Sequence, residues 1–204
     1  MIRLPRLYAI LDISCFRDNQ TLFSTAEELF AGGVSLLQYR NKSGDARQML
    51  EQAGELRRRL GGSVKLIMDD RADICLAAEF DGVHVGQEDL SAAGARKVIG
   101  DTLWLGVSTH NPEQVMAADK TSADYIAVGP VFSTTSKANP DPVIGLEGVR
   151  HARALSRKPL VAIGGINRAN CREVLEAGAD SVAVISDLMR DPRKSAEDFL
   201  RILG

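Results

Sequence analysis

The chain has 204 residues, of which 25 are Lys or Arg and 27 are Asp or Glu, so its formal net charge is −2. This balance argues against proteins that bind nucleic acid or anionic membranes through bulk positive charge. With 45% hydrophobic and 25% charged residues, the composition is typical of a soluble globular chain that can bury a large core.

Apolar stretches such as Leu7–Leu11 are far shorter than the roughly 20 residues that a membrane span needs. Asp12 interrupts the first stretch before it reaches signal-peptide length. The cysteines, Cys15, Cys75 and Cys171, are scattered and form no CxxC pair, so neither a disulfide framework nor a zinc site is indicated. We therefore predict a cytoplasmic protein without a nucleic-acid or membrane partner, and the sequence leaves a homo-oligomer open.

Short runs rich in apolar and β-branched residues recur along the chain and predict strands. Helix-compatible segments lie between them, such as Ala46–Leu60, and Pro112–Ala118 behind a predicted N-cap at Asn111. Strand followed by helix, repeated, predicts a parallel sheet. The predicted strands are Leu7–Asp12, Ser35–Arg40, Lys65–Asp70, Gly82–Val85, Trp104–Thr109, Tyr125–Pro130, Pro159–Gly165 and Ser181–Ser186.

Eight such units in about 200 residues match the compact end of the (β/α)8 barrel range. No Pro/Ser-rich linker divides the chain, which predicts one domain over residues 1–204. An open doubly wound sheet usually carries a glycine-rich dinucleotide loop after its first strand, whereas the corresponding segment here reads DISCFR. We therefore predict an α/β protein with a single, compact TIM barrel.

Polar residues gather at the predicted C-terminal ends of the strands, where barrels hold their active sites. Strand alternation places Gln38, Arg40 and Lys42 on the inward face and turns Tyr39 toward the helices. An amide, a guanidinium and an ammonium group together suit a polyanion. The alternative, a solvated strand end, does not explain a glutamine within an apolar run.

The next two predicted strands bring carboxylates to the same end of the barrel. Asp69 and Asp70 end one strand, and Asp89 lies in the loop after the other. Mg²⁺ takes one or two protein carboxylates and completes its shell with water and substrate phosphates. Either Asp70 or Asp89 alone could instead cap a helix, but the two together favour a metal site.

Later strand ends carry hydroxyls, a lysine and bare backbone amides, which are groups that bind phosphate. They include Ser108, the segment 133–137, and Gly164–Gly165 followed by Ile185–Ser186, where barrels commonly bind phosphate. The glycines could alternatively only permit tight turns. Among the histidines, only His110 falls at a strand end.

These motifs, in this order, resemble the thiamine phosphate synthase family over nearly the whole chain. The resemblance rests on residues 38–42 (QYRNK), 69–71 (DDR), 82–90 (GVHVGQEDL), 106–110 (GVSTH), 129–137, 164–166 (GGI) and 178–186. It implies a transferase of the TIM-barrel fold that acts with Mg²⁺.

The implied reaction condenses 4-amino-2-methyl-5-(diphosphooxymethyl)pyrimidine with 5-(2-phosphooxyethyl)-4-methylthiazole to thiamine phosphate and releases pyrophosphate. Asp70 and Asp89 would hold the Mg²⁺, and Arg40, Lys42 and Lys137 would supply the catalytic positive charge. By motif position, the pyrimidine diphosphate would be bound by Gln38, Tyr39, Arg40, Asn41, Lys42, Asp69, Ser108 and Lys137. The thiazole phosphate would be bound by Thr134, Thr135, Ser136, Gly165, Ile185 and Ser186.

Two positions depart from the family's pattern. The family often has Asn where this chain has Asp69, and a carboxylate cannot donate as an amide does unless it is protonated. Asp69 could bind the pyrimidine amino group or lie in the outer shell of the metal. The family's Pro-Thr-x-Thr-Lys is STTSK at residues 133–137, which keeps hydroxyls and the lysine but loses the stiffness of proline.

Three alternatives share this fold. A thiazole tautomerase-like paralogue would lack the pyrophosphate and metal residues, and His110 would suit it. A non-catalytic regulator would bind the thiazole phosphate without turnover, and a sugar-phosphate isomerase is open on fold alone. Retention of Arg40, Lys42, Asp70 and Asp89 argues against a tautomerase, which has no pyrophosphate to handle.

Overall fold

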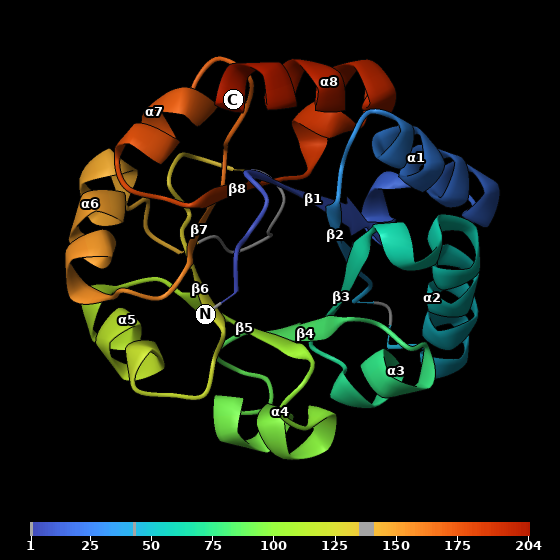
Figure 1. Ribbon diagram of the computed structural model, residues 1–204, viewed down its shortest axis with the longest axis horizontal. Coiled ribbons are helices and arrows are strands. Elements are labelled where there is room, and N and C mark those ends of the chain that lie inside the picture. Colours follow the sequence, from blue (N-terminus) through green and yellow to red (C-terminus); the bar gives the residue numbers. More distant parts are fainter. Residues whose placement is uncertain (1, 43, 135–140) are drawn as a thin grey trace.

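The structure is a computed structural model that describes residues 2–42, 44–134 and 141–204. Within these residues, eight parallel strands close into a barrel in chain order, with β8 bonded to β1. Figure 1 looks down this barrel, with the helices as an outer ring. The predicted (β/α)8 barrel is therefore confirmed. The strands are β1 (Leu7–Asp12), β2 (Leu36–Arg40), β3 (Lys65–Asp69), β4 (Gly82–Val85), β5 (Trp104–Thr109), β6 (Tyr125–Val128), β7 (Leu160–Ile163) and β8 (Ser181–Val184).

A helix follows each strand, and several start at side-chain caps. Asn111 Oδ1 accepts a hydrogen bond from Gln114 N at 2.9 Å, as predicted from the sequence. No helix in the described ranges is long and apolar enough to cross a membrane. The helices are α1 (Asn19–Ala31), α2 (Ala46–Leu60), α3 (Ala72–Ala77), α4 (Ala92–Ile99), α5 (Pro112–Asp119), α6 (Gly145–Leu155), α7 (Cys171–Glu176) and α8 (Pro192–Leu203), with 3-10 turns η1 (Ile13–Cys15), η2 (Gly61–Ser63) and η3 (Ser186–Leu188).

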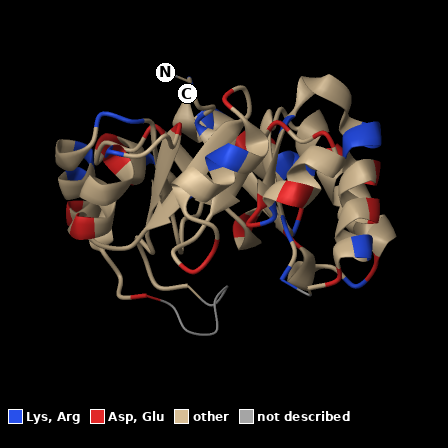
Figure 2. Ribbon diagram, turned by 90° about the horizontal axis from the view of Figure 1, so that it is seen from below, with Lys and Arg blue, Asp and Glu red and all other residues tan. Residues whose placement is uncertain are grey.

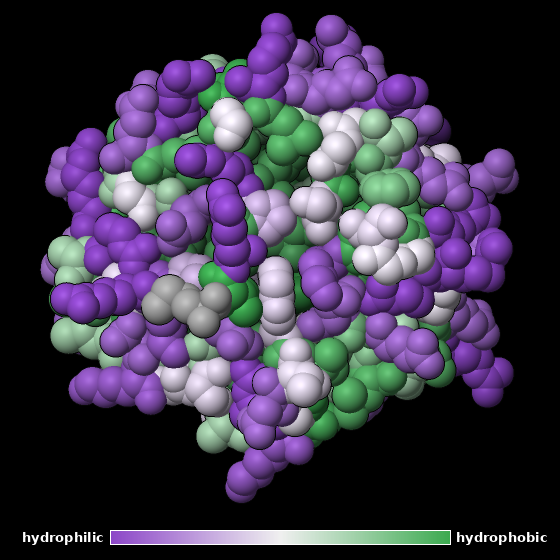
Figure 3. Space-filling view, in the orientation of Figure 1, coloured by the Kyte–Doolittle hydropathy of each residue, from purple (hydrophilic) through white to green (hydrophobic). Residues whose placement is uncertain are grey.

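The strands are buried on both faces, which is why they appear in the sequence as continuous apolar runs. Outward side chains such as Leu37 and Tyr39 pack under the helices, whereas inward ones such as Leu36, Ile67 and Tyr125 fill the barrel. Hydrophilic side chains dominate the rim in Figure 3, and Figure 2 shows basic and acidic residues mixed over the helices. The alternation predicted for residues 36–42 thus holds along β2.

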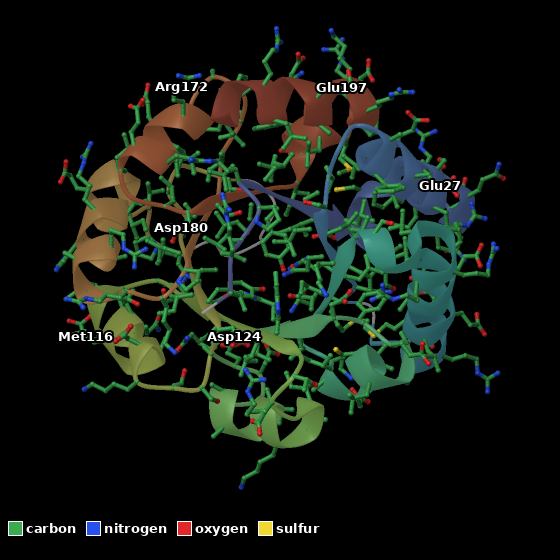
Figure 4. All side chains as sticks on the ribbon, viewed as in Figure 1. Glu27, Met116, Asp124, Arg172, Asp180 and Glu197 are labelled. Carbon is green, nitrogen blue, oxygen red and sulfur yellow. The ribbon has the colours of Figure 1, made fainter. Side chains whose placement is uncertain are left out.

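An ion pair repeats at the N-terminal ends of the strands. In each copy, an arginine near the end of a helix binds the aspartate just before a later strand: α2 pairs with the residue before β4, α4 with the residue before β6, and α6 with the residue before β8. The pairs, which we call the arginine clamps, are Arg57 to Asp81 at 2.6 Å, Arg96 to Asp124 at 2.8 Å and Arg153 to Asp180 at 3.0 Å. In Figure 4, Asp124 and Asp180 lie inside the ring of helices, whereas Glu197 lies at its outer edge.

Each clamp also secures the backbone of the strand between its two partners. Asp124 Oδ2 accepts hydrogen bonds from Arg96 and from Leu105 N, both at 2.8 Å. The other guanidinium nitrogen of Arg96 donates to the carbonyl oxygens of Gly100 and Leu103 at 2.8 Å. One half-buried guanidinium therefore ties a helix end, a turn and a strand start together.

Replacing Asp124 by alanine is expected to lower the free energy of unfolding by about 2 kcal/mol, because Arg96 and the Leu105 N–H both lose their acceptor. Urea denaturation would measure this. The control is Asp101→Ala, which removes an exposed carboxylate before β5 and should change stability by less than about 0.5 kcal/mol. Equal effects from the two variants would mean that the clamp contributes nothing.

Candidate active site

A cavity of about 750 Å³, the central cavity, opens at the C-terminal ends of the strands. Most of the predicted site residues line it, although they come from seven of the strands and the loops after them. His110 lines it as well, with Nδ1 2.7 Å from the Gly129 carbonyl oxygen. The predicted residues that line the cavity are Gln38, Arg40, Lys42, Asp69, Asp70, Asp89, Ser108, Thr134, Gly165, Ile185 and Ser186.

Two of the five other predicted residues are described by the structure, and neither lines this cavity. Tyr39 and Asn41 face α2, where the Tyr39 hydroxyl donates to Gln52 and Asn41 Nδ2 lies 2.9 Å from the Tyr39 oxygen. The strand alternation that turns Gln38 inward turns these two side chains outward, so they support the end of β2 instead of reaching a ligand. The others, Thr135, Ser136 and Lys137, lie outside the described residues.

Two cations from β2 and the loop after it stand on one side of the cavity among carboxylates. Arg40 pairs with Asp12 at the end of β1, and Lys42 pairs with Asp70. Asp69 Oδ2 lies 3.2 Å from Lys42 Nζ and 3.7 Å from Arg40 Nε. Burial opposes the charge of Lys42, but Asp69 and Asp70 outweigh it and raise the pKa of Lys42. Lys42 is therefore held charged at the cavity.

Asp70 and Asp89 form the acidic part of the same wall. Asp70 has a φ of 61°, a left-handed conformation that Asp tolerates better than most residues. Its carboxyl group shares a hydrogen bond with that of Asp89, and burial together with Asp69 raises the pKa of Asp70 to about 6. The N-caps of α3 and α4 are Arg71 and Ser91, so neither aspartate is used to cap a helix.

The donor set of this wall fits a hard divalent cation. Two neighbouring carboxylates concentrate negative charge that a cation would offset, and Mg²⁺ favours oxygen ligands of this kind. Among the described residues, no group of three or more His, Cys, Asp or Glu side chains is placed to hold a metal ion. Mg²⁺ needs no such cage, because water and substrate phosphates complete its shell.

The glycine loop after β7 lies on the opposite side of the cavity, where Gly165 is half-buried. Gly165 has a φ of 63°, and a Cβ there would meet Phe132 Cβ at 2.7 Å. Only glycine therefore lets the loop after β7 pass this close to the loop after β6. Ile185 and Ser186 line the cavity beside it at the start of η3, which suits a phosphate group.

At the floor of the cavity, side chains from five strands form one continuous series of hydrogen bonds, the interior chain. Gln38 Nε2 lies 3.0 Å from the Tyr8 oxygen, and the Tyr8 and Tyr125 hydroxyls lie 3.0 Å apart. His84 Nδ1 is 3.1 Å from the Tyr125 oxygen, and His84 Nε2 is 2.8 Å from Ser108 Oγ. Only the two ends of this chain were predicted as site residues.

The sequence gives little signal for the other members, because their partners lie far away along the chain. Tyr8 and Tyr125 are 117 residues apart, and Asp12 is 28 residues from Arg40. Strand alternation is the one local indication. Tyr8 and Asp12 are two residues either side of Ile10 on β1, and Tyr8 and Ile10 both line the cavity. A polar side chain at an inward position of a barrel strand therefore indicates a residue of the site.

Burial lowers the pKa of His84 from its usual 6.5 to about 4. The unfolded chain therefore binds a proton at His84 between these values while the folded chain does not, so stability falls as the pH falls. From pH 7 to pH 5 this residue should cost about 2 kcal/mol of unfolding free energy. Urea denaturation at both pH values would measure the loss, and His84→Gln should reduce it. An equal loss in that variant would assign the effect to other groups.

Comparison with known proteins identifies the family. A family model described as thiamine monophosphate synthase matches residues 7–188. A protein of Koribacter versatilis named thiamine-phosphate synthase is 59% identical over 99% of this chain and 97% of its own length, and one of Chloroflexus aurantiacus is 47% identical over 89% and 83%. The solved thiamine phosphate pyrophosphorylase of Pyrococcus furiosus superposes with a TM-score of 0.86 and 37% identity, covering 97% of this chain and 95% of that one. The chain belongs to the thiamine monophosphate synthase family, as its motifs predicted.

Proposed function

We propose that this chain is a thiamine-phosphate synthase, a transferase that joins the pyrimidine diphosphate to the thiazole phosphate and releases pyrophosphate. The observation that carries the proposal is the division of the central cavity. Arg40 and Lys42 stand with Asp70 and Asp89 on one wall, and the half-buried backbone of Gly165 lies on the other. The cavity thus offers separate places for a diphosphate with its cation and for a second phosphate.

The reaction asks for charge neutralisation more than for acid or base groups. The bond between the pyrimidine methylene carbon and the diphosphate oxygen breaks, and its electron pair leaves with the diphosphate. The thiazole nitrogen then gives its lone pair to the methylene carbon, forming the new C–N bond without a proton transfer. The hard step is the departure of the diphosphate, and fixed positive charge lowers its barrier.

Arg40 and Lys42 are placed to provide that charge. Asp12 holds the guanidinium of Arg40, and Asp70 orients the ammonium of Lys42. Lys137 would add a third cation by its motif position. When bound, Mg²⁺ would neutralise diphosphate charge, with Asp70 and Asp89 as its protein ligands.

The floor and far wall of the cavity would hold the two rings and keep water away. Ile10, Ala127 and Val161 line the cavity, and an apolar floor protects a pyrimidine methylene cation from capture by water. Gly165 and Ser186 would hold the thiazole phosphate, so that the nitrogen is aligned for attack. We place the activity in the cytoplasm, in keeping with the free thiols of Cys75 and Cys171.

The test is to mix the purified chain with both substrates and Mg²⁺. We expect thiamine phosphate, measured as fluorescent thiochrome, to form in equal amount with released pyrophosphate, and EDTA to abolish both. If neither product forms while the thiazole phosphate still binds, the synthase proposal is wrong. Deuterium exchange at the thiazole would then separate a tautomerase from a regulator.

A further inference from the structure

The donors and acceptors of the interior chain depend on one another. Tyr8 accepts from Gln38 Nε2, so its single proton is left for Tyr125, which in turn donates to His84 Nδ1. A neutral imidazole that accepts at Nδ1 carries its proton on Nε2. His84 therefore donates to Ser108 Oγ. The Ser108 proton and the Gln38 carbonyl oxygen remain to face the cavity.

The chain has one other fully bonded arrangement, in which every donor is reversed. If the Gln38 amide turns over, Tyr8 donates to it, and the sequence of donors then begins at Ser108. Any mixture of the two directions leaves one link of the chain with no proton, or with two protons facing each other, so a buried hydrogen bond is lost. Whether Gln38 presents a donor or an acceptor to the cavity therefore depends on whether Ser108 donates or accepts.

Gly106 on β5 leaves room for the Tyr125–His84 hydrogen bond at the centre of this chain. A Cβ at Gly106 would overlap both His84 Nδ1 and the Tyr125 hydroxyl. Any other residue there would occupy the space of the Tyr125–His84 hydrogen bond. Tyr125 itself is fully buried and is not among the residues lining the cavity, so it can act on a ligand only through its neighbours.

We propose that the interior chain couples recognition of the two ends of the pyrimidine diphosphate. A phosphate oxygen can only accept, so at Ser108 it selects the direction in which Ser108 donates and Gln38 presents its carbonyl oxygen. That oxygen then requires an N–H donor, which the amino group of the pyrimidine supplies. Tyr125 is a positioning residue in this arrangement. The inference rests on the proposed function for the identity of the substrate.

The test compares the pyrimidine diphosphate with the analogue in which oxygen replaces the ring amino group. We expect the wild type to favour the amino compound in kcat/KM by about 100-fold or more. Tyr125→Phe, which breaks the chain at its centre, should reduce that preference about tenfold or more, mainly through KM for the amino compound. The Kd for inorganic pyrophosphate should change less than about twofold, because Tyr125 does not line the cavity where pyrophosphate is proposed to bind.

Thr109→Val is the matched control. Thr109 adjoins Ser108 on the same strand, and its buried hydroxyl donates to the Ala127 carbonyl oxygen at 2.9 Å, away from the interior chain. This variant should keep the wild-type preference. An unchanged preference in Tyr125→Phe overturns the inference, as does a wild type that uses both compounds equally well. If the wild type uses neither compound, the proposed function falls with it.

A second measurement uses only wild-type protein and inorganic pyrophosphate, so it depends neither on a folded variant nor on the pyrimidine substrate. In wild-type protein with ¹⁵N-labelled histidine and bound inorganic pyrophosphate, the ring nitrogens of His84 report its tautomer. We expect a neutral ring with the proton on Nε2. A proton on Nδ1 would mean that the chain runs in the opposite direction and would overturn the coupling.

Discussion

Asp70→Ala is expected to lower kcat about 100-fold or more while the barrel stays folded. Asp70 contacts Lys42 and Asp89 at the cavity, so its loss removes a proposed metal ligand and leaves Lys42 paired, among the described residues, with Asp69 alone. The Mg²⁺ dependence of the rate should shift to higher concentrations. Steady-state assays across a Mg²⁺ series would measure both effects.

The backbone at this position calls for a second variant. Alanine at a φ of 61° adds strain of about 1 kcal/mol, whereas asparagine tolerates that conformation. Asp70→Asn should therefore keep wild-type stability and still lose activity. Asp73→Asn is the control, because Asp73 is an exposed partner of Arg71 on α3. Wild-type rates and Mg²⁺ dependence in both Asp70 variants would remove this residue from the mechanism.

Arg40→Gln is expected to lower kcat/KM for the pyrimidine diphosphate about 1,000-fold, because a fixed positive charge beside the leaving group is lost. It should also lower the free energy of unfolding by about 3 kcal/mol, since Asp12, only 3% exposed, would lose its ion-pair partner. The affinity for the thiazole phosphate should stay close to the wild-type value, because that ligand is proposed to bind at the opposite wall.

A double variant separates the two effects of Arg40. Adding Asp12→Asn to Arg40→Gln removes the unpaired carboxylate, so stability should recover while activity stays low. Urea denaturation and initial rates on the same preparations would show this. If the double variant recovered activity along with stability, Arg40 would matter for the fold alone.

The barrel can be predicted from the sequence because each strand appears there as a short apolar run that can be recognised by itself. The strand predicted at 159–165 is shorter in the structure, β7 (Leu160–Ile163), since Gly164 adopts a φ of 102° that ends the extended run. Parity along β2 likewise predicted which side chains turn inward. The motif range that also included Tyr39 and Asn41 ignored that parity, and these two residues face α2.

Contacts across the barrel could not be predicted in the same way. Whether Asp12 meets Arg40 depends on the register between β1 and β2, where the two residues are aligned. The Tyr8–Tyr125 hydrogen bond spans the barrel interior and depends on which side chains its other strands place there. Such pairs follow from closure of the sheet, and no short stretch of sequence contains that information.

The arginine clamps have a consequence for how the chain can assemble. Their spans, 57–81, 96–124 and 153–180, do not overlap. The partners of each clamp therefore lie within one stretch of chain, and none depends on the contact between β1 and β8 that closes the ring. A chain cut between two spans keeps each pair within one fragment, whereas a cut inside a span divides it.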